Sequence, residues 1–277
     1  MKINLIMPTI GRSHEVFSYI KSIENSDGNN VITNLYVLDQ NETLLSELRG
    51  YQSEGLTVRM VKSENKGLSL NRNRGLMKVD SGICGFPDDD CLYYPDSLSK
   101  ISEYFSENSD VDVVIGRIFD RNKQCNIIKN WPDRETVVNK FNFYSLASSI
   151  TLFLREKPSL LFDERLGAGA LYGSCEDPDF LYRLLKQGKK IVYTPSIEVW
   201  HPTPDERAVS LAKVYSYASG FGAFIRKDFD VIKVLLLLGC VAKKMFQLIF
   251  ENSKFRKGYF SAFYHGLIIG ITNGGTD

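Results

Sequence analysis

The sequence of 277 residues has few cysteines, and no two of them stand in a C-x-x-C spacing. They are Cys84, Cys91, Cys125, Cys175 and Cys240. An odd number at irregular spacing argues against a disulfide framework and indicates free thiols in a reducing compartment. We also expect no signal peptide, because the first apolar stretch, residues 3–7, is too short for one and is typical of a strand. These features predict a cytoplasmic protein.

Long apolar runs, a strong charge imbalance and the common nucleotide-binding glycine motifs are also missing. No apolar run reaches the length of a membrane-spanning helix. The 34 Lys and Arg residues nearly balance the 33 Asp and Glu residues, so we expect no nucleic acid partner. Neither the P-loop pattern nor the dinucleotide glycine fingerprint occurs. The sequence therefore lacks the motifs of kinases, of other P-loop enzymes and of NAD-dependent enzymes.

The first half of the sequence alternates between strand-like and helix-like patterns. Strands are predicted over residues 3–7, 31–38, 56–61, 82–86 and 111–115, and helices over residues 11–24, 44–48, 68–77 and 97–105. Such alternation predicts βαβ units and a mostly parallel sheet. The second half is less regular. There we expect a strand over 145–154 that could be antiparallel, a helix over 179–187, and a strand over 190–193 that ends before Pro195.

Acidic residues follow two of the predicted strands, namely Asp39 and the run Asp88-Asp89-Asp90. Ligands of parallel sheets bind beyond the carboxyl ends of the strands, so both acidic sites should face one edge. Three adjacent carboxylates repel one another, and a divalent cation that bridges them to a diphosphate would offset this repulsion. We expect Asp88 and Asp90 to point to the same side of an extended segment. The alternative is a solvated acidic turn, or a cap for the helix that begins at Ser97.

Three further motifs could take part in chemistry. Glu176-Asp177 precedes a predicted helix, where Asp177 could be a general base or could merely cap the helix. His201, one of three histidines, could bind a metal or be a structural residue. The basic segment 66–75 could hold phosphates, or it could form a solvated helix face.

In their order along the chain these motifs resemble family 2 glycosyltransferases of the GT-A fold, especially bacterial enzymes that build surface polysaccharides. The resemblance covers roughly residues 3–203. It consists of Met7-Pro8-Thr9 with Arg12, Leu38-Asp39, Asn65-Lys66-Gly67-Leu68-Ser69 with Arg72-Asn73-Arg74-Gly75, Phe86-Pro87-Asp88-Asp89-Asp90, Phe162-Asp163-Glu164-Arg165-Leu166-Gly167-Ala168-Gly169, Gly173-Ser174-Cys175-Glu176-Asp177-Pro178-Asp179, and Trp200-His201-Pro202. Two departures are Gln40 after Asp39, where the family often has Asp-Gly-Ser, and Cys175, where glycine is common.

The resemblance implies a role for each matching residue. Asp90 and His201 would hold Mn²⁺ or Mg²⁺, Asp177 would be the catalytic base, and Glu176 would support it. Asp39 would recognise the base of the nucleotide. The remaining donor-binding residues would be Pro8, Thr9, Arg12, Lys66, Arg72, Asp88 and Asp89, of which Asp89 has the least defined role.

The implied fold is an α/β GT-A fold with a mixed, mostly parallel sheet flanked by helices. We expect residues 1–115 to form the nucleotide-sugar-binding half, residues 116–208 the half with the acceptor site and the catalytic base, and residues 209–277 a helical C-terminal extension. The implied reaction is inverting transfer of a sugar from a UDP- or dTDP-sugar to a hydroxyl of a glycan or lipid-linked saccharide. The alternatives are a nucleotidyltransferase that makes sugar nucleotides and a non-catalytic protein that binds nucleotide sugars.

The C-terminal region combines an apolar helix with positive charge. A helix over residues 231–250 would have a broad apolar face and one narrow polar stripe, made of Lys233, Lys243, Lys244, Gln247 and Glu251. Residues 213–257 contain nine Lys or Arg and three Asp or Glu. Aromatic and cationic residues then mix over 254–264, from Lys254 and Arg256 onward. We expect residues 231–277 to contact an anionic membrane surface on the inner face of the cell membrane. A helical cap or a homo-oligomer interface is the alternative.

Overall fold

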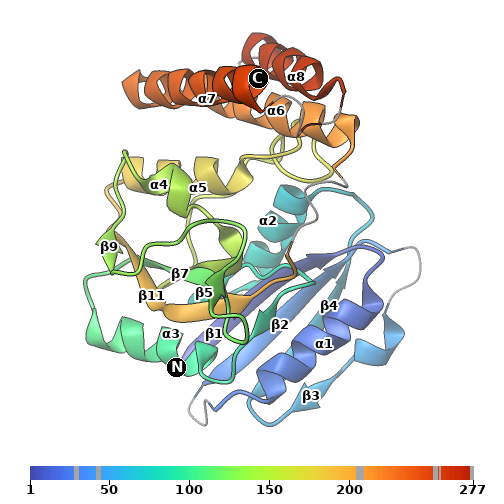
Figure 1. Cartoon of the computed structure of the whole chain (residues 1–277). Coiled ribbons are helices and arrows are strands. Elements are labelled where there is room, and N and C mark those ends of the chain that lie inside the picture. Colours follow the sequence, from blue (N-terminus) through green and yellow to red (C-terminus); the bar gives the residue numbers. More distant parts are fainter. Residues whose placement is uncertain (28–30, 42–44, 204–208, 252–254, 256, 275–277) are drawn as a thin grey trace. The chain divides into compact units, whose positions relative to one another are not determined.

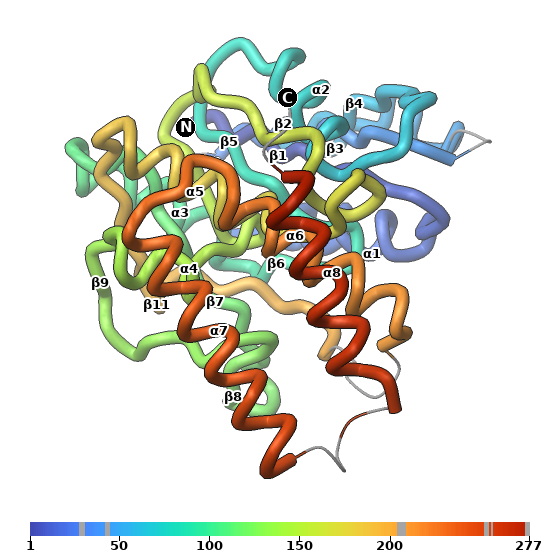
Figure 2. The backbone as a smooth tube through the Cα atoms, turned by 90° about the horizontal axis from the view of Figure 1, so that it is seen from above, coloured from blue at the N-terminus to red at the C-terminus, as the bar shows by residue number. Residues whose placement is uncertain are grey.

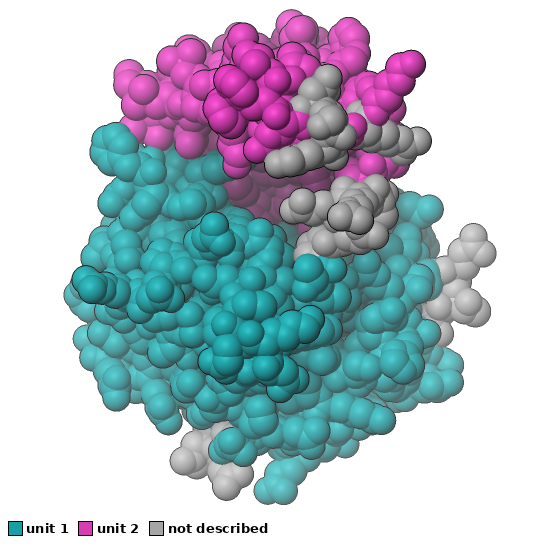
Figure 3. Space-filling model, viewed as in Figure 1, with its two compact units in different colours: residues 1–66, 70–162, 180–204 teal, residues 67–69, 163–179, 205–277 magenta. Residues whose placement is uncertain are grey.

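The computed structural model describes residues 1–27, 31–41, 45–203, 209–251, 255 and 257–274. The chain divides into two compact units (Figure 3). Unit 1 comprises Met1–Lys66, Leu70–Phe162 and Phe180–Pro204. Unit 2 comprises Gly67–Ser69, Asp163–Asp179 and Asp205–Asp277.

Unit 1 is built around one mixed sheet. In the described residues the sheet has eleven strands, in the order β3-β4-β2-β1-β5-β10-β7-β11-β6, with β8 paired to β7 and β9 to β11. The strands are β1 (Lys2–Thr9), β2 (Ile32–Asp39), β3 (Gln52–Ser53), β4 (Leu56–Lys62), β5 (Ile83–Gly85), β6 (Leu92–Tyr93), β7 (Val113–Asp120), β8 (Cys125–Asn126), β9 (Thr136–Val137), β10 (Leu152–Leu154) and β11 (Ile191–Trp200). Helices α1 (Ser13–Glu24) and α3 (Ser97–Glu107) lie below the sheet in the view of Figure 1, and α2 (Leu68–Lys78) lies above it.

The centre of the sheet explains why two acidic sites share an edge. Strand β1 is buried over all but its first residue, as its continuous apolar run predicts for a central parallel strand. It pairs in parallel with β2, which places Thr9 opposite Asp39, and in parallel with β5 on its other side. The carboxyl ends of these three strands therefore meet at one edge of the sheet. The prediction that Asp39 and the aspartate run face one edge is confirmed.

Strand β11 is longer than its sequence pattern predicts. It continues through Pro195 to Trp200, whereas we expected it to end before that proline. Its register with β7 shifts between Tyr193 and Glu198, and a proline is tolerated at such an irregularity because its missing N–H is not needed there. Gly116 of β7 makes room for the irregularity, because a Cβ atom at this position would lie 2.4 Å from the carbonyl oxygen of Ile197.

Other predicted elements also need correction. Residues 145–154 form no single strand but the end of α4 (Phe143–Leu146), a 3₁₀ turn over Ser149–Thr151, and β10. Short apolar runs cannot distinguish helix from strand by periodicity, although β10 is antiparallel to both neighbours as expected. The helix predicted over 44–48 is a 3₁₀ turn over Ser46–Leu48, and Leu44 lies outside the described residues. Helix α5 (Glu176–Lys186) begins before the predicted residue 179, because Pro178 fits the first turn of a helix.

Unit 2 contains three long helices, α6 (Leu211–Arg226), α7 (Val231–Phe250) and α8 (Tyr259–Asn273). Helices α6 and α8 lie side by side (Figure 2). Glycines allow this close packing: a Cβ atom at Gly266 would lie 2.2 Å from the carbonyl oxygen of Tyr215, and one at Gly270 would lie 2.1 Å from that of Ser219. Within the described ranges, no helix combines the length and the apolar character that crossing a membrane requires.

We expect Gly116→Ala to lower the free energy of unfolding by about 1–3 kcal/mol, because the added methyl group overlaps the β11 backbone. Gly239→Ala in α7 is the matched control. No atom lies within 4 Å of its added Cβ, so the loss of a mid-helix glycine should raise that free energy by about 0.5–1 kcal/mol. Urea denaturation followed by circular dichroism measures both. A Gly116→Ala protein as stable as the wild type would contradict the close approach of β7 and β11.

Candidate active site

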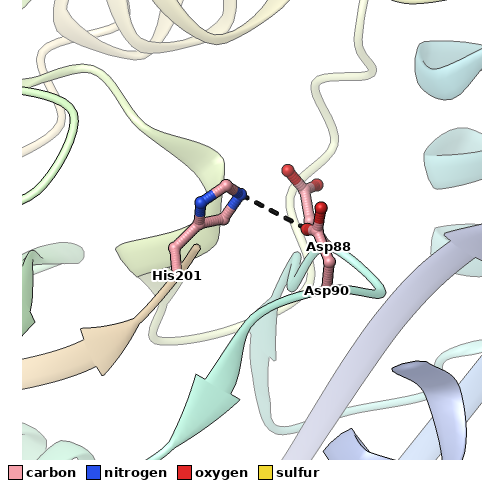
Figure 4. A group of neighbouring side chains, drawn as sticks. All are labelled: Asp88, Asp90 and His201. Atoms are coloured by element: carbon pink, nitrogen blue, oxygen red, sulfur yellow. Dashed lines mark ion pairs between the residues drawn. The ribbon is translucent and has the colours of Figure 1, made fainter. Parts of the chain in front are cut away.

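Three side chains converge at the carboxyl edge of the sheet in unit 1. One ligand atom from each of Asp88, Asp90 and His201 lies within 4.8 Å of the other two (Figure 4). The Nε2 atom of His201 is 3.3 Å from Oδ1 of Asp90. The aspartates are not in the extended segment we expected. They form a turn, because the backbone N–H of Cys91 donates to the carbonyl oxygen of Asp88.

Strand pairing brings His201 to the aspartates. Strand β6 begins just after the acidic turn, and β11 ends just before His201. The two strands are antiparallel, with Trp200 opposite Leu92. The residue after one strand therefore lies beside the residues that precede the other. Of the two interpretations of His201, a metal ligand or a structural residue, its place beside the carboxylates favours the first.

Asp89 is not a member of this group and is buried. Its Oδ2 atom accepts a hydrogen bond from the Thr9 hydroxyl at 2.7 Å, and its Oδ1 atom accepts one from Nη1 of Arg12 at 2.9 Å. The same Arg12 nitrogen donates to Oδ2 of Asp90 at 2.5 Å. Thr9 is the last residue of β1, and Arg12 directly precedes α1. These contacts connect the acidic turn to the neighbouring strand and helix.

Arg72 holds the third aspartate. Its Nη2 atom donates to Oδ1 of Asp88 at 3.1 Å and to the Ser149 hydroxyl at 2.7 Å, and its guanidinium lies over the Phe162 ring. Arg72 is only 1% exposed, so the alternative of a solvated helix face is wrong for this residue. Lys66, from the same basic segment, is exposed. Ser149 was not among the predicted site residues, and no local pattern in the sequence singles it out.

Asp39 is fully buried and bonded to its own loop. Its Oδ1 atom accepts from the backbone and side chain of Asn41, and its Oδ2 atom accepts from the backbone N–H of Leu45. Asn41 in turn accepts a hydrogen bond from the backbone N–H of Gly11. Pro8 is buried in β1. The roles of Asp39 and Pro8 in nucleotide binding stay predictions.

The electrostatics differ among the acidic groups. Burial tends to raise the pKa of Asp90, but the hydrogen bonds and charges of His201 and Arg12 outweigh this effect and lower it. Burial also tends to lower the pKa of His201, yet the nearby Asp90 carboxylate raises it. For Asp89, burial prevails over Thr9 and Arg12, and its pKa is raised. The Asp90 carboxyl is therefore more readily ionised than that of Asp89, as a ligand for a cation should be.

The donor set fits a divalent cation. Two carboxylates and one imidazole are oxygen and nitrogen ligands that suit Mn²⁺, whereas Mg²⁺ prefers oxygen alone. Ligand atoms of one octahedral ion lie about 3 Å apart. The separation of 3.3 Å between Asp90 Oδ1 and His201 Nε2 is close to this value.

Glu176 and Asp177 belong to unit 2, in the first turn of α5. Both are half-buried, and Cys175 before them has a left-handed backbone with φ of 71°. The family often has glycine at that position, which this conformation favours. The third acid of the turn, Asp179, accepts a hydrogen bond from Lys227 at 3.1 Å, and Lys227 also donates to Asp163 at 2.8 Å. Asp179 thus joins α5 to the end of α6, a role the sequence motif did not reveal.

Comparisons with known proteins agree with this architecture. The profile of glycosyl transferase family 2 matches residues 5–157, more than half of the chain. A comparison with curated protein sequences finds no match. Among solved structures, S. aureus TarS 1–349 in complex with UDP-GlcNAc is similar with a TM-score of 0.67 and 15% sequence identity, over 98% of this chain and 82% of that one. The same TarS fragment with UDP has a TM-score of 0.61 and 17% identity, over 83% and 67%.

The similarity to TarS confirms the α/β GT-A fold predicted from the sequence, with its mixed and mostly parallel sheet flanked by helices. The family profile begins within β1, extends past β10 and includes the whole acidic turn, Arg12 and Arg72. The chain belongs to glycosyl transferase family 2.

Proposed function

We propose that this protein is an inverting glycosyltransferase of cell-surface polysaccharide synthesis. It moves a sugar from a UDP- or dTDP-sugar to a hydroxyl of a glycan or lipid-linked saccharide. The observation that carries the proposal is the convergence of Asp88, Asp90 and His201 at the carboxyl edge of the sheet, with Arg12 and Arg72 beside them. The TarS complexes with UDP and UDP-GlcNAc support a nucleotide-sugar donor.

Asp88, Asp90 and His201 would hold a divalent ion, Mn²⁺ or Mg²⁺, which when bound supplies positive charge against the diphosphate of the donor. Arg12 and Arg72 each bind one of the outer aspartates and so keep the carboxylates in place. Both guanidiniums add positive charge at the edge where the leaving nucleoside diphosphate becomes more negative. Pro8, Thr9, Asp39, Lys66 and Asp89 complete the proposed donor site.

Asp177 is the proposed general base. It would take the proton of the acceptor hydroxyl, whose oxygen then attacks the anomeric carbon from the face opposite the leaving group. One such displacement inverts the configuration and needs no protein nucleophile. Asp177 lies in the N-terminal turn of α5, and Glu176 would support it from the same turn.

We expect Asp90→Asn to abolish binding of Mn²⁺ to the protein alone and to slow sugar transfer by at least about 100-fold, because a charged ligand is lost. Asp110→Asn is the matched control, since Asp110 is an exposed acid of unit 1 paired with Lys190. Mn²⁺ binding is measured by electron paramagnetic resonance, and transfer by release of UDP or dTDP from a panel of donors. Unchanged transfer in Asp90→Asn would contradict the metal assignment. Pyrophosphate release from NTP and sugar 1-phosphate would instead favour a nucleotidyltransferase.

We expect Asp177→Asn to slow transfer by about 10²- to 10⁴-fold while UDP binding with Mn²⁺ stays unchanged, because a general base acts only in the chemical step. Calorimetry measures UDP binding, and donor turnover measures the rate. Asp133→Asn, at a highly exposed carboxylate, controls for the substitution itself. Full activity of Asp177→Asn would rule out this base.

We also propose that residues 231–277 attach the protein to an anionic membrane surface, at the inner face of the cell membrane. Helix α7 supports this because two lysines of its polar stripe, Lys233 and Lys244, bind groups within unit 2. Lys233 is the one buried residue of the helix, and its Nζ atom donates to the carbonyl oxygens of Phe224 and Lys227 at the end of α6. Burial lowers the pKa of Lys233 to about 8. Lys244 donates to Gln247 at 3.0 Å and to the Tyr259 hydroxyl of α8 at 2.8 Å.

The apolar side of α7 is consequently exposed. Eight large apolar side chains of the helix are between 39% and 72% exposed, namely Val231, Leu235, Leu238, Met245, Phe246, Leu248, Ile249 and Phe250. Burying them would be worth on the order of 10 kcal/mol. They cover an arc of about 200° at 100° per residue, wider than the seam that one partner helix covers. A lipid surface covers such an arc. Residues 213–257 have an excess of positive charge that suits anionic lipids, although Lys227 and Lys233 face groups of unit 2 and do not contribute to it.

Vesicle flotation tests the attachment. We expect the protein to float with vesicles of phosphatidylcholine and phosphatidylglycerol, and the variant Leu238→Asn/Phe246→Asn/Ile249→Asn to stay in solution, because three exposed apolar anchors are lost. Met77→Asn, at an apolar residue of α2 that is 62% exposed, should float like the wild type. A dimer in solution that the triple variant converts to a monomer would instead make α7 a homo-oligomer interface. Lys254 and Arg256, also predicted to contact the membrane, lie outside the described residues.

A further inference from the structure

The two oxygens of Asp90 have different surroundings. Oδ2 lies 2.5 Å from Nη1 of Arg12, and Oδ1 faces Nε2 of His201 at 3.3 Å. A cation shared with His201 would therefore bind Oδ1. The contact with Arg12 occupies the other oxygen and sets the rotation of the carboxylate. Arg12 can set this rotation only if Arg12 is itself held in place.

Arg12 needs such support because its side chain is 47% exposed. A single ion pair between exposed groups is worth about 0–1 kcal/mol and does not fix a long side chain. The same Arg12 nitrogen, however, also donates to Oδ1 of Asp89 at 2.9 Å. Asp89 is only 7% exposed, and its other oxygen accepts from the Thr9 hydroxyl at 2.7 Å. Thr9 is 1% exposed and lies in the central strand β1.

We infer that Thr9, Asp89 and Arg12 form a bridge from strand β1 to Asp90 that positions Asp90 Oδ1 as a single-oxygen metal ligand. We call these three residues the Asp89 bridge. The inference rests on the proposed function, since it supposes that the acidic turn binds a divalent ion. It gives the middle aspartate a defined role: Asp89 holds Arg12, and Arg12 holds Asp90. All three are positioning residues in the absence of donor, whatever contacts they make once a nucleotide sugar binds.

The Asp89 bridge and a simple charge effect predict different changes in metal binding when Arg12 or Thr9 is substituted. Arg12 is a cation near a cation site, so electrostatics alone would make its removal strengthen metal binding. A bridge that orients the ligand instead makes metal binding depend on geometry, even when no charge changes. Substitutions that keep every charge therefore separate the two. Thr9→Val removes only a hydroxyl, and Arg12→Lys keeps the positive charge but loses the guanidinium geometry.

The test measures Mn²⁺ binding to the full chain without nucleotide, by electron paramagnetic resonance of free and bound Mn²⁺. We expect Thr9→Val and Arg12→Lys each to weaken binding by about 10- to 100-fold, the usual effect of losing a group that orients a metal ligand. Thr9→Ser keeps the hydroxyl and should bind within about threefold of the wild type. Circular dichroism and urea denaturation show whether each variant is folded, and Arg12→Lys, at a half-exposed site, remains informative if Thr9→Val is not.

Each outcome decides between the proposals. If the wild type binds no Mn²⁺, the proposed metal site itself fails. If the wild type binds Mn²⁺ and the folded variants bind it equally well, the metal site stands and the Asp89 bridge is wrong. Tighter binding in Arg12→Lys would mean that Arg12 competes with the cation for Asp90, which also overturns the bridge. Weak binding in Thr9→Ser as well as Thr9→Val would attribute the loss to packing of β1 and not to the hydroxyl.

Discussion

The mutual repulsion of three adjacent carboxylates is the constraint on which the edge of the unit 1 sheet depends. The structure resolves it by giving each aspartate a different partner. Asp88 binds the buried Arg72, Asp89 binds Thr9 and Arg12, and Asp90 lies between Arg12 and His201. These partners come from β1, from the residue before α1, from α2 and from the residue after β11, so the acidic turn connects four parts of the chain.

We propose that this arrangement suits the edge to bind both a cation and a diphosphate. The outer aspartates and His201 supply ligand atoms of one cluster, while two guanidiniums lie on its margin. Neutral partners would satisfy the carboxylates less well, because a buried charge needs an opposite charge or a strong donor. The cationic partners of the acidic turn are therefore as much a part of the proposed site as the carboxylates.

Unit 2 illustrates a different use of charge. Two lysines form contacts at the end of α6. Lys227 binds Asp163 and Asp179. Lys233 donates to main-chain carbonyls. Turning Lys233 and Lys244 inward leaves the apolar side of α7 exposed, which is the reverse of an ordinary surface helix. Apolar side chains exposed to water cost free energy. Contact with an apolar surface would remove that cost.

The sequence by itself determined the alternation of strands and helices, the edge that Asp39 and the aspartates share, and the motifs of the family. These follow from local periodicity and from the common direction of parallel strands, both of which a single segment reveals. Tertiary structure alone decided the pairing of β6 with β11 that places His201, and the continuation of β11 through Pro195. It also decided the partners of Asp89, the contact of Ser149 with Arg72, and which side of α7 faces α6. Register and side-chain partners depend on packing between segments far apart in the chain, whose energies no local pattern contains.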